Sequence, residues 1–218
     1  PESDVGENGH RWKGVAASAV ASAGLYASRR YYRNWGTTKD ECDMALPGDE
    51  LVAQPVLQTT EGVWIEAPAA EVWPWLVQMG QDRGGLYSYE KLENLVGMKH
   101  RNADRIHPEW QQLAVGDVIR VLPRGWMGLR DGVGLPVAAL TEGESIVLRL
   151  QPPDLPVDGV WSFHVMPRWE DRSRLLVRTR LRMRAPGEAI GAEAAGPAMS
   201  LMTRGMLLGI KRRVEQSF

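Results

Sequence analysis

The chain has 218 residues, 44% of them hydrophobic, and a formal net charge of -1. This length and composition predict one folded domain with a core of its own. The near-zero charge provides no global field for binding nucleic acid, so no nucleic-acid partner is predicted. The single cysteine, Cys42, excludes an internal disulfide framework.

Residues 1–34 are interpreted as an N-terminal extension. Residues 14–28 are small and mildly apolar, with basic residues on both sides. We interpret them as an Ala-rich helix that lies on the domain or, through residues 14–33, on a membrane surface. A membrane anchor and an export signal stay open as alternatives, although the run is short and weakly apolar for either. The predicted location is the cytoplasm, with membrane association as the alternative.

Residues 35–55 are predicted to form a strap that connects the extension to the domain, which spans residues 56–218. Thr38 stands before acidic residues that include Glu41, which is typical of a capped helix start. Residues 46–49 read Leu-Pro-Gly-Asp, a turn signal.

The domain opens with a predicted strand at 56–66, which ends before Pro68. A helical segment follows, and Gly84-Gly85 then allows a turn into a second short helix. The first of these helices is indicated by apolar residues near helical spacing, namely Val72, Trp73, Leu76 and Met79.

The histidines suggest two hypotheses. His100, Asp104 and His107 would share one face of a helix and could hold a metal, but Pro108 favours a loop. We therefore predict no metal and no cofactor. His164 is interpreted as a hydrogen-bonded sheet residue rather than a catalytic one.

The pattern after residue 115 changes to the alternation of strands. A strand is predicted at 118–122, a Gly-rich loop at 123–134, and hairpin-forming pairs at 135–140 with 145–151 and 160–167 with 175–184. In the last strand, one face is apolar and the other carries arginine. The alternation predicts an antiparallel sheet with one buried face and one solvated face. The solvated face carries Arg178, Arg180, Arg182 and Arg184.

A long C-terminal helix is predicted at 197–216, with Pro197 in its first turn. Its apolar stripe favours core packing or, because methionine is flexible, an adaptable hydrophobic pocket. Gly205 and Gly209 weaken the helix unless something packs closely there. The stripe consists of Met199, Met202, Met206, Ile210 and Val214.

A strand, two short helices, five further strands and a terminal helix form the order of an α+β helix-grip fold: a curved antiparallel sheet wrapped around a long C-terminal helix. Several motifs carry a resemblance to a family with this fold. They are Trp-Gly-Thr-Thr at 35–38, Leu-Pro-Gly-Asp-Glu at 46–50, Val-Trp-Pro-Trp-Leu-Val-Gln-Met-Gly at 72–80, Arg-Gly-Gly-Leu-Tyr-Ser-Tyr at 83–89, Leu-Glu-Asn at 92–94 and Val-Gly-Asp at 115–117.

With these motifs, the chain resembles the START-like (SRPBCC) superfamily of polyketide cyclases, dehydrases and lipid-transport proteins, and within it an actinobacterial subgroup. The resemblance implies binding, or transport, of a lipid, isoprenoid or polyketide in a cavity between the sheet and the C-terminal helix. The alternatives are a cyclase, aromatase or dehydratase that uses Tyr87, His164 or Arg83, and a membrane-associated interaction module. The oligomeric state is left open. The predicted ligand-binding residues are Trp73, Leu76, Met79, Arg83, Tyr87, Tyr89, Leu92, Trp161, Phe163, Met199, Met202, Met206 and Ile210.

Overall fold

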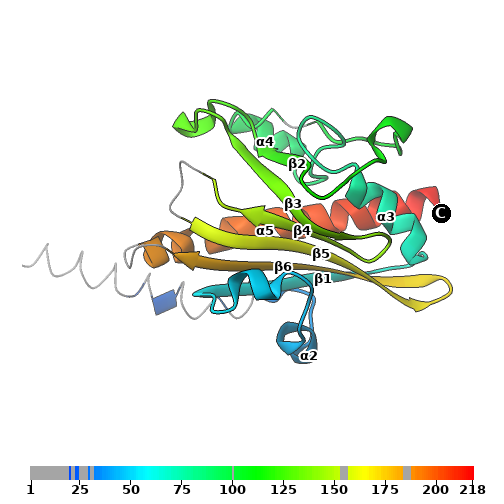
Figure 1. The fold of residues 1–218 in the computed structure, drawn as a ribbon, viewed down its shortest axis with the longest axis horizontal. Coiled ribbons are helices and arrows are strands. Elements are labelled where there is room, and N and C mark those ends of the chain that lie inside the picture. Colours follow the sequence, from blue (N-terminus) through cyan, green and yellow to red (C-terminus); the bar gives the residue numbers. More distant parts are fainter. Residues whose placement is uncertain are drawn as a thin grey trace, which may run out of the picture.

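The computed structural model describes residues 20, 23–24, 29, 32–99, 101–152, 157–183 and 188–218. Their strands form one antiparallel sheet in the order β1-β6-β5-β4-β3-β2, and helix α5 lies along one face of it (Figure 1). The predicted α+β helix-grip class is confirmed. The strands are β1 (Leu57–Ile65), β2 (Val118–Leu122), β3 (Val133–Thr141), β4 (Ser145–Leu150), β5 (Val157–Trp169) and β6 (Arg172–Met183). The helices are α2 (Lys39–Asp43), α3 (Ala69–Val77), α4 (Glu90–Leu95) and α5 (Glu188–Ser217), with single 3₁₀ turns at Asp49–Val52, Pro108–Trp110 and Trp126–Gly128.

The core lies between the inner face of the sheet and α5. Leu175 and Val177 of β6 are buried there, and Val177 pairs with Phe163 of β5. Ile210 and Val214 of α5 belong to the same cluster. Burial of these apolar side chains holds the helix on the sheet, because each square ångström removed from water contributes about 25 cal/mol.

The strap of residues 35–55 lies against the outer face of the sheet. Its helix α2 begins with the predicted cap: the Thr38 hydroxyl accepts the Glu41 N–H, and the Glu41 carboxylate accepts the Thr38 N–H. The predicted turn at 46–49 is also present, with Gly48 at a φ of 96°. The strap therefore forms a third layer, opposite α5.

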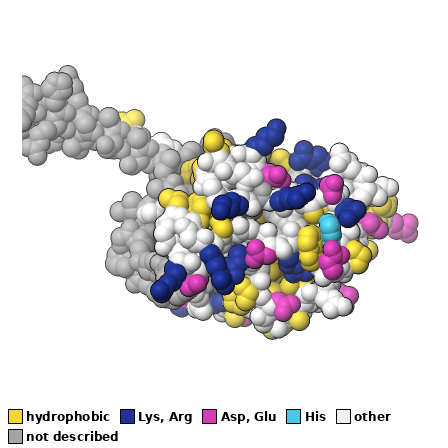
Figure 2. Space-filling view, turned by 90° about the horizontal axis from the view of Figure 1, so that it is seen from above, with side chains coloured by type: hydrophobic (Ala, Val, Ile, Leu, Met, Phe, Trp, Pro, Cys, Tyr) yellow, Lys and Arg dark blue, Asp and Glu magenta, His cyan; other side chains and the backbone are white. Residues whose placement is uncertain are grey.

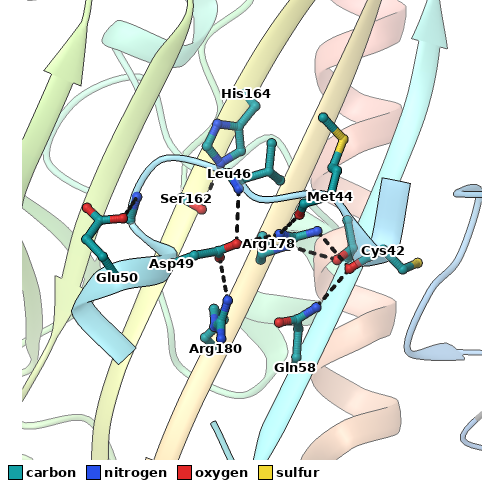
Figure 3. A network of polar contacts seen from close by, with 12 residues as sticks. Cys42, Met44, Leu46, Asp49, Glu50, Gln58, Ser162, His164, Arg178 and Arg180 are labelled. Atoms are coloured by element: carbon teal, nitrogen blue, oxygen red, sulfur yellow. Dashed lines mark hydrogen bonds and ion pairs between the residues drawn. The ribbon is translucent and has the colours of Figure 1, made fainter. Parts of the chain in front are cut away.

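This layer buries part of the arginine face that the sequence predicted to be solvated. Arg178 is only 1% exposed, whereas the side chain of Arg182, beyond the strap, is 58% exposed. Arg184 lies outside the described residues. Alternation indicates which side of a strand a residue faces, but not what covers that side. Arg178 donates to Asp49 Oδ2 at 2.7 Å, to the carbonyls of Met44, Glu41 and Cys42 at 2.7 to 3.0 Å, and to Thr60 Oγ1 at 3.1 Å (Figure 3).

His164 lies on the same covered face, beneath the turn at 46–49 (Figure 3). It is 2% exposed, and its Nε2 lies 2.9 Å from Ser162 Oγ. Burial and the positive charge of Arg178 lower the pKa of His164 to about 4. The interpretation as a hydrogen-bonded sheet histidine agrees with this geometry.

Helix α5 begins earlier than predicted, at Glu188 rather than Pro197. Residues 188–196 are rich in Ala and Glu, which are strong helix formers. Pro197 is consequently inside the helix, where it has no N–H to donate to the preceding turn.

The glycines of α5 allow the close approach that their presence suggested. A Cβ on Gly209 would lie 1.8 Å from the Tyr87 carbonyl oxygen, and one on Gly205 would lie 2.5 Å from the Tyr89 ring. Tyr87 has a φ of 59°, so its backbone turns sharply toward the helix. Glycine is required at position 209 because the Tyr87 backbone occupies the space that a side chain would need.

We expect Gly209→Ala to lower the free energy of unfolding by about 1–3 kcal/mol, because the methyl group must displace the Tyr87 backbone. This result would oppose helix propensity, which favours Ala over Gly by about 1 kcal/mol. Gly191→Ala is the matched control, since a Cβ added at this position of the same helix would meet no atom within 4 Å. Urea denaturation should show the two variants shifting in opposite directions; equal shifts would contradict the packing argument.

Most of the apolar run at 14–28 lies outside the described residues. In the part of the chain that is described, no helix combines the length and the apolar character needed to cross a membrane.

Candidate functional site

A cavity of about 400 Å³ lies between the inner face of the sheet, α5 and the segments around α4. This volume falls within the range of small-molecule sites. The sheet contributes Val121, Leu122, Leu135, Leu150, Trp161 and Thr179. Helix α5 contributes Ala195, Ala198, Met199, Met202, Thr203 and Met206. The segments around α4 and the loop after β2 contribute Leu86, Ser88, Glu93, Met98 and Trp126.

Of the described residues that line the cavity, all are apolar except four: Ser88, Glu93, Thr179 and Thr203. Glu93 is 1% exposed, and its pKa is raised, chiefly by burial, with the nearby Glu90 carboxylate adding to the effect. An apolar chamber with few polar groups can bind a hydrophobic molecule and fix its orientation.

Each wall segment is positioned by a local feature of the sequence. Met199, Met202 and Met206 follow one another at helical spacing on α5. Trp161 on β5 packs edge to face against Phe163, with 4.7 Å between ring centroids. Trp126 belongs to the Gly-rich loop after β2, and its Nε1 donates to the Val96 carbonyl at 2.9 Å. That bond ties the loop to the end of α4.

The structure brings four of the thirteen sequence-predicted site residues to this cavity: Trp161, Met199, Met202 and Met206. Five others are buried in the hydrophobic core: Leu76, Met79, Tyr87, Phe163 and Ile210. Trp73 lines a different pocket with Val77 and Leu113. Tyr89 and Leu92 are exposed by 39% and 47%. Whether any of the thirteen binds a ligand stays a prediction.

The groups named for a catalytic alternative do not line the cavity. The Tyr87 hydroxyl donates to the Trp75 carbonyl at 3.0 Å, and burial raises its pKa. Arg83 donates to the Trp110 carbonyl, and His164 lies on the opposite face of the sheet. Of the titratable side chains described, Glu93 is the one that lines the cavity.

The sequence-based prediction named Tyr87, Tyr89 and Leu92 from the segment that in fact contributes Leu86, Ser88 and Glu93. The positive φ of Tyr87 changes the direction of the chain just before α4, so the facing residues could not be read from spacing. Glu93 could not be predicted from hydrophobic periodicity either, because a carboxyl side chain is polar even where it is buried. Thr179 could have been found, because it shares the apolar face of the last strand.

Among the described residues, no group of three His, Cys, Asp or Glu side chains is placed to hold a metal. His107 stacks on Trp110 and lies 3.1 Å from Glu109. His100 lies outside the described residues. On the face shown in Figure 2, basic and acidic side chains are interspersed.

No protein-family model matches the chain, and no curated protein matches it. Several solved structures are similar in fold. A solution structure of a protein from Thermobifida fusca is 15% identical, with a TM-score of 0.49 over 73% of this chain and 93% of that one. Truncated norcoclaurine synthase from Thalictrum flavum is 15% identical, with a TM-score of 0.45 over 72% and 92%. An aromatase/cyclase from a Streptomyces species is 14% identical, with a TM-score of 0.46 over 73% and 94%. At such identities the likeness concerns the fold, and no statement about function follows from it.

Proposed function

We propose that this protein binds a hydrophobic small molecule, such as a lipid, isoprenoid or polyketide, in the cavity between the sheet and α5. The proposal includes membership of the START-like superfamily, which the motifs between 35 and 117 indicate. Binding without catalysis is favoured over the enzyme alternative, because Tyr87, His164 and Arg83 do not reach the cavity.

The observation that carries the proposal is the apolar cavity itself. Its walls come from the sheet, α5 and the α4 region. A ligand that enters it would gain about 25 cal/mol for each square ångström of apolar surface removed from water. Methionine side chains on one wall can adjust to ligands of different shape. Met199 is 45% exposed and marks a side on which the cavity approaches solvent.

We expect Ala198→Phe to weaken binding of a neutral hydrophobic probe such as Nile red by about tenfold or more, because the added ring occupies the cavity. Fluorescence titration of delipidated protein measures the change. Leu208→Phe is the matched control: Leu208 is on the same helix, is 38% exposed and does not line the cavity. Equal affinities of the two variants, with both folded by circular dichroism, would place the probe elsewhere.

Native mass spectrometry of protein purified from its own host should show a co-purifying small molecule in the original protein and less of it in the Ala198→Phe variant. Absence of saturable uptake of every lipid, sterol and polyketide probe by delipidated protein would count against the proposed function.

A further inference from the structure

A second, smaller hollow adjoins the cavity and differs from it in chemistry. This side pocket, about 30 Å³ in volume, lies between β1, β6 and α5 and is lined by Tyr32, Thr59, Glu61 and Ser200, among others. Thr179, Met199 and Thr203 line both spaces. A volume of this size has room for about two water-sized groups. The side pocket therefore adds polar groups, including the carboxyl of Glu61, at one side of the apolar cavity.

The hydrogen bonds of the side pocket indicate an uncharged Glu61. Ser200 Oγ lies 2.6 Å from the Tyr32 carbonyl oxygen and 3.1 Å from Glu61 Oε2. A hydroxyl has one proton and can donate to only one of them. If Ser200 donates to the closer Tyr32 carbonyl, it has no proton left for Glu61. The contact with Glu61 is then a hydrogen bond only when Glu61 is protonated and donates to Ser200 Oγ.

Burial supports the same state. Glu61 is 2% exposed, and burial raises its pKa to about 8, although Ser200 and the charge of Arg204 act in the opposite direction. A neutral Glu61 keeps acceptor capacity on its carboxyl oxygens.

The side pocket also holds an unused donor. The Tyr32 hydroxyl is buried and has no hydrogen-bond partner among the described residues. Unsatisfied buried polar groups are uncommon and are often completed by a water or a ligand. A donor on Tyr32 and an acceptor on Glu61 match the two capacities of one alcohol group, which both accepts and donates.

We propose that the side pocket binds the hydroxyl group of a hydrophobic alcohol whose apolar body occupies the main cavity. This inference rests on the proposed function and specifies its ligand class. The ligand hydroxyl accepts from the Tyr32 hydroxyl and donates to Glu61. Met199 lines both spaces, and its unbranched side chain can change rotamer readily to accommodate the ligand.

The test compares 1-octanol with 1-fluorooctane, which has the same chain but no hydroxyl. Displacement of Nile red gives both affinities in the original protein and in Tyr32→Phe, which deletes one oxygen atom. We expect Tyr32→Phe to weaken octanol about five- to tenfold, the range of one neutral hydrogen bond, and to leave fluorooctane unchanged. Glu61→Leu, which removes the acceptor, should have the same selective effect.

Ser88→Ala is the matched control, because Ser88 lines the main cavity at the α4 side and not the side pocket. If Ser88→Ala weakens octanol and Tyr32→Phe does not, the hydroxyl binds at the α4 side and the inference is wrong. Equal losses for both ligands in Tyr32→Phe, or none, would mean that the side pocket holds water alone. Failure of both ligands to bind the original protein would overturn the proposed function itself.

Discussion

Glu61→Gln is expected to raise the free energy of unfolding at pH 8 by roughly 3–5 kcal/mol, an unusual gain for a single substitution. The carboxyl is buried, and its pKa in the folded protein is about 8 against an ordinary value of 4.5. Between these two values the unfolded chain releases the proton while the folded protein retains it. The protonated Glu61 carboxyl therefore makes its full contribution to the free energy of unfolding below about pH 4.5, and this contribution is lost as the pH rises through 8.

Glutamine removes this pH dependence and keeps the contact, since its amide can donate to Ser200 Oγ. Urea denaturation at pH 4.5 and pH 8 should show similar stability of the two proteins at the lower pH and a more stable variant at the higher. Glu142→Gln, at an exposed turn between β3 and β4, is the control and should change stability by less than about 0.5 kcal/mol at either pH. A Glu61→Gln variant less stable than the original protein at pH 8 would show that Glu61 is ionised and stabilising.

Arg178→Ala is expected to lower the free energy of unfolding by about 3–5 kcal/mol, because it removes one partner of a buried ion pair. Of its two arginine partners, Asp49 keeps only Arg180, at 3.0 Å. The carbonyls of Glu41 and Met44 lose the hydrogen bond from Arg178. The strap should then separate from the sheet before the rest of the domain unfolds. Hydrogen exchange should report this as faster exchange in residues 39–52.

The control for this prediction is Arg182→Ala, on the same face of β6 but with 58% of its side chain exposed. A change within about 1 kcal/mol is expected there, because the Arg182 side chain is mostly exposed and the buried Asp158 keeps its ion pair with Arg149. If the two alanine variants are equally stable, the strap does not depend on the buried arginine.

Much of the fold could be predicted because its signals are local. The Thr38 cap depends on residues within one helical turn, and the hairpin between β3 and β4 depends on alternation around a turn at residues 142–144. The apolar face of β6 and the methionine stripe of α5 follow from periods of two and 3.6 residues. These periods determine which face is apolar, and burial of apolar faces against each other determines the layers.

The candidate site could be predicted only where one regular element supplies it. Met199, Met202 and Met206 could be named because the helix makes their direction predictable. Ser88 and Trp126 lie outside the strands and α-helices, and Glu93 lies on the short helix α4. Tyr87, just before Ser88, has a positive φ that redirects the chain before that helix begins. No repeat in the sequence encodes that direction.

The element types, the helix-grip order and the apolar stripe of α5 could be predicted from the residues alone, since each follows from local propensity and hydrophobic periodicity. Three features became visible only in the folded chain: the strap covers Arg178, Glu61 lines the side pocket, and Glu93 rather than Tyr87 lines the cavity. These features depend on contacts between residues far apart in the chain, such as Glu61 with Ser200 and Arg178 with Asp49. The identity of a polar residue does not indicate whether water or protein surrounds it, although these surroundings determine its protonation state and its chemistry.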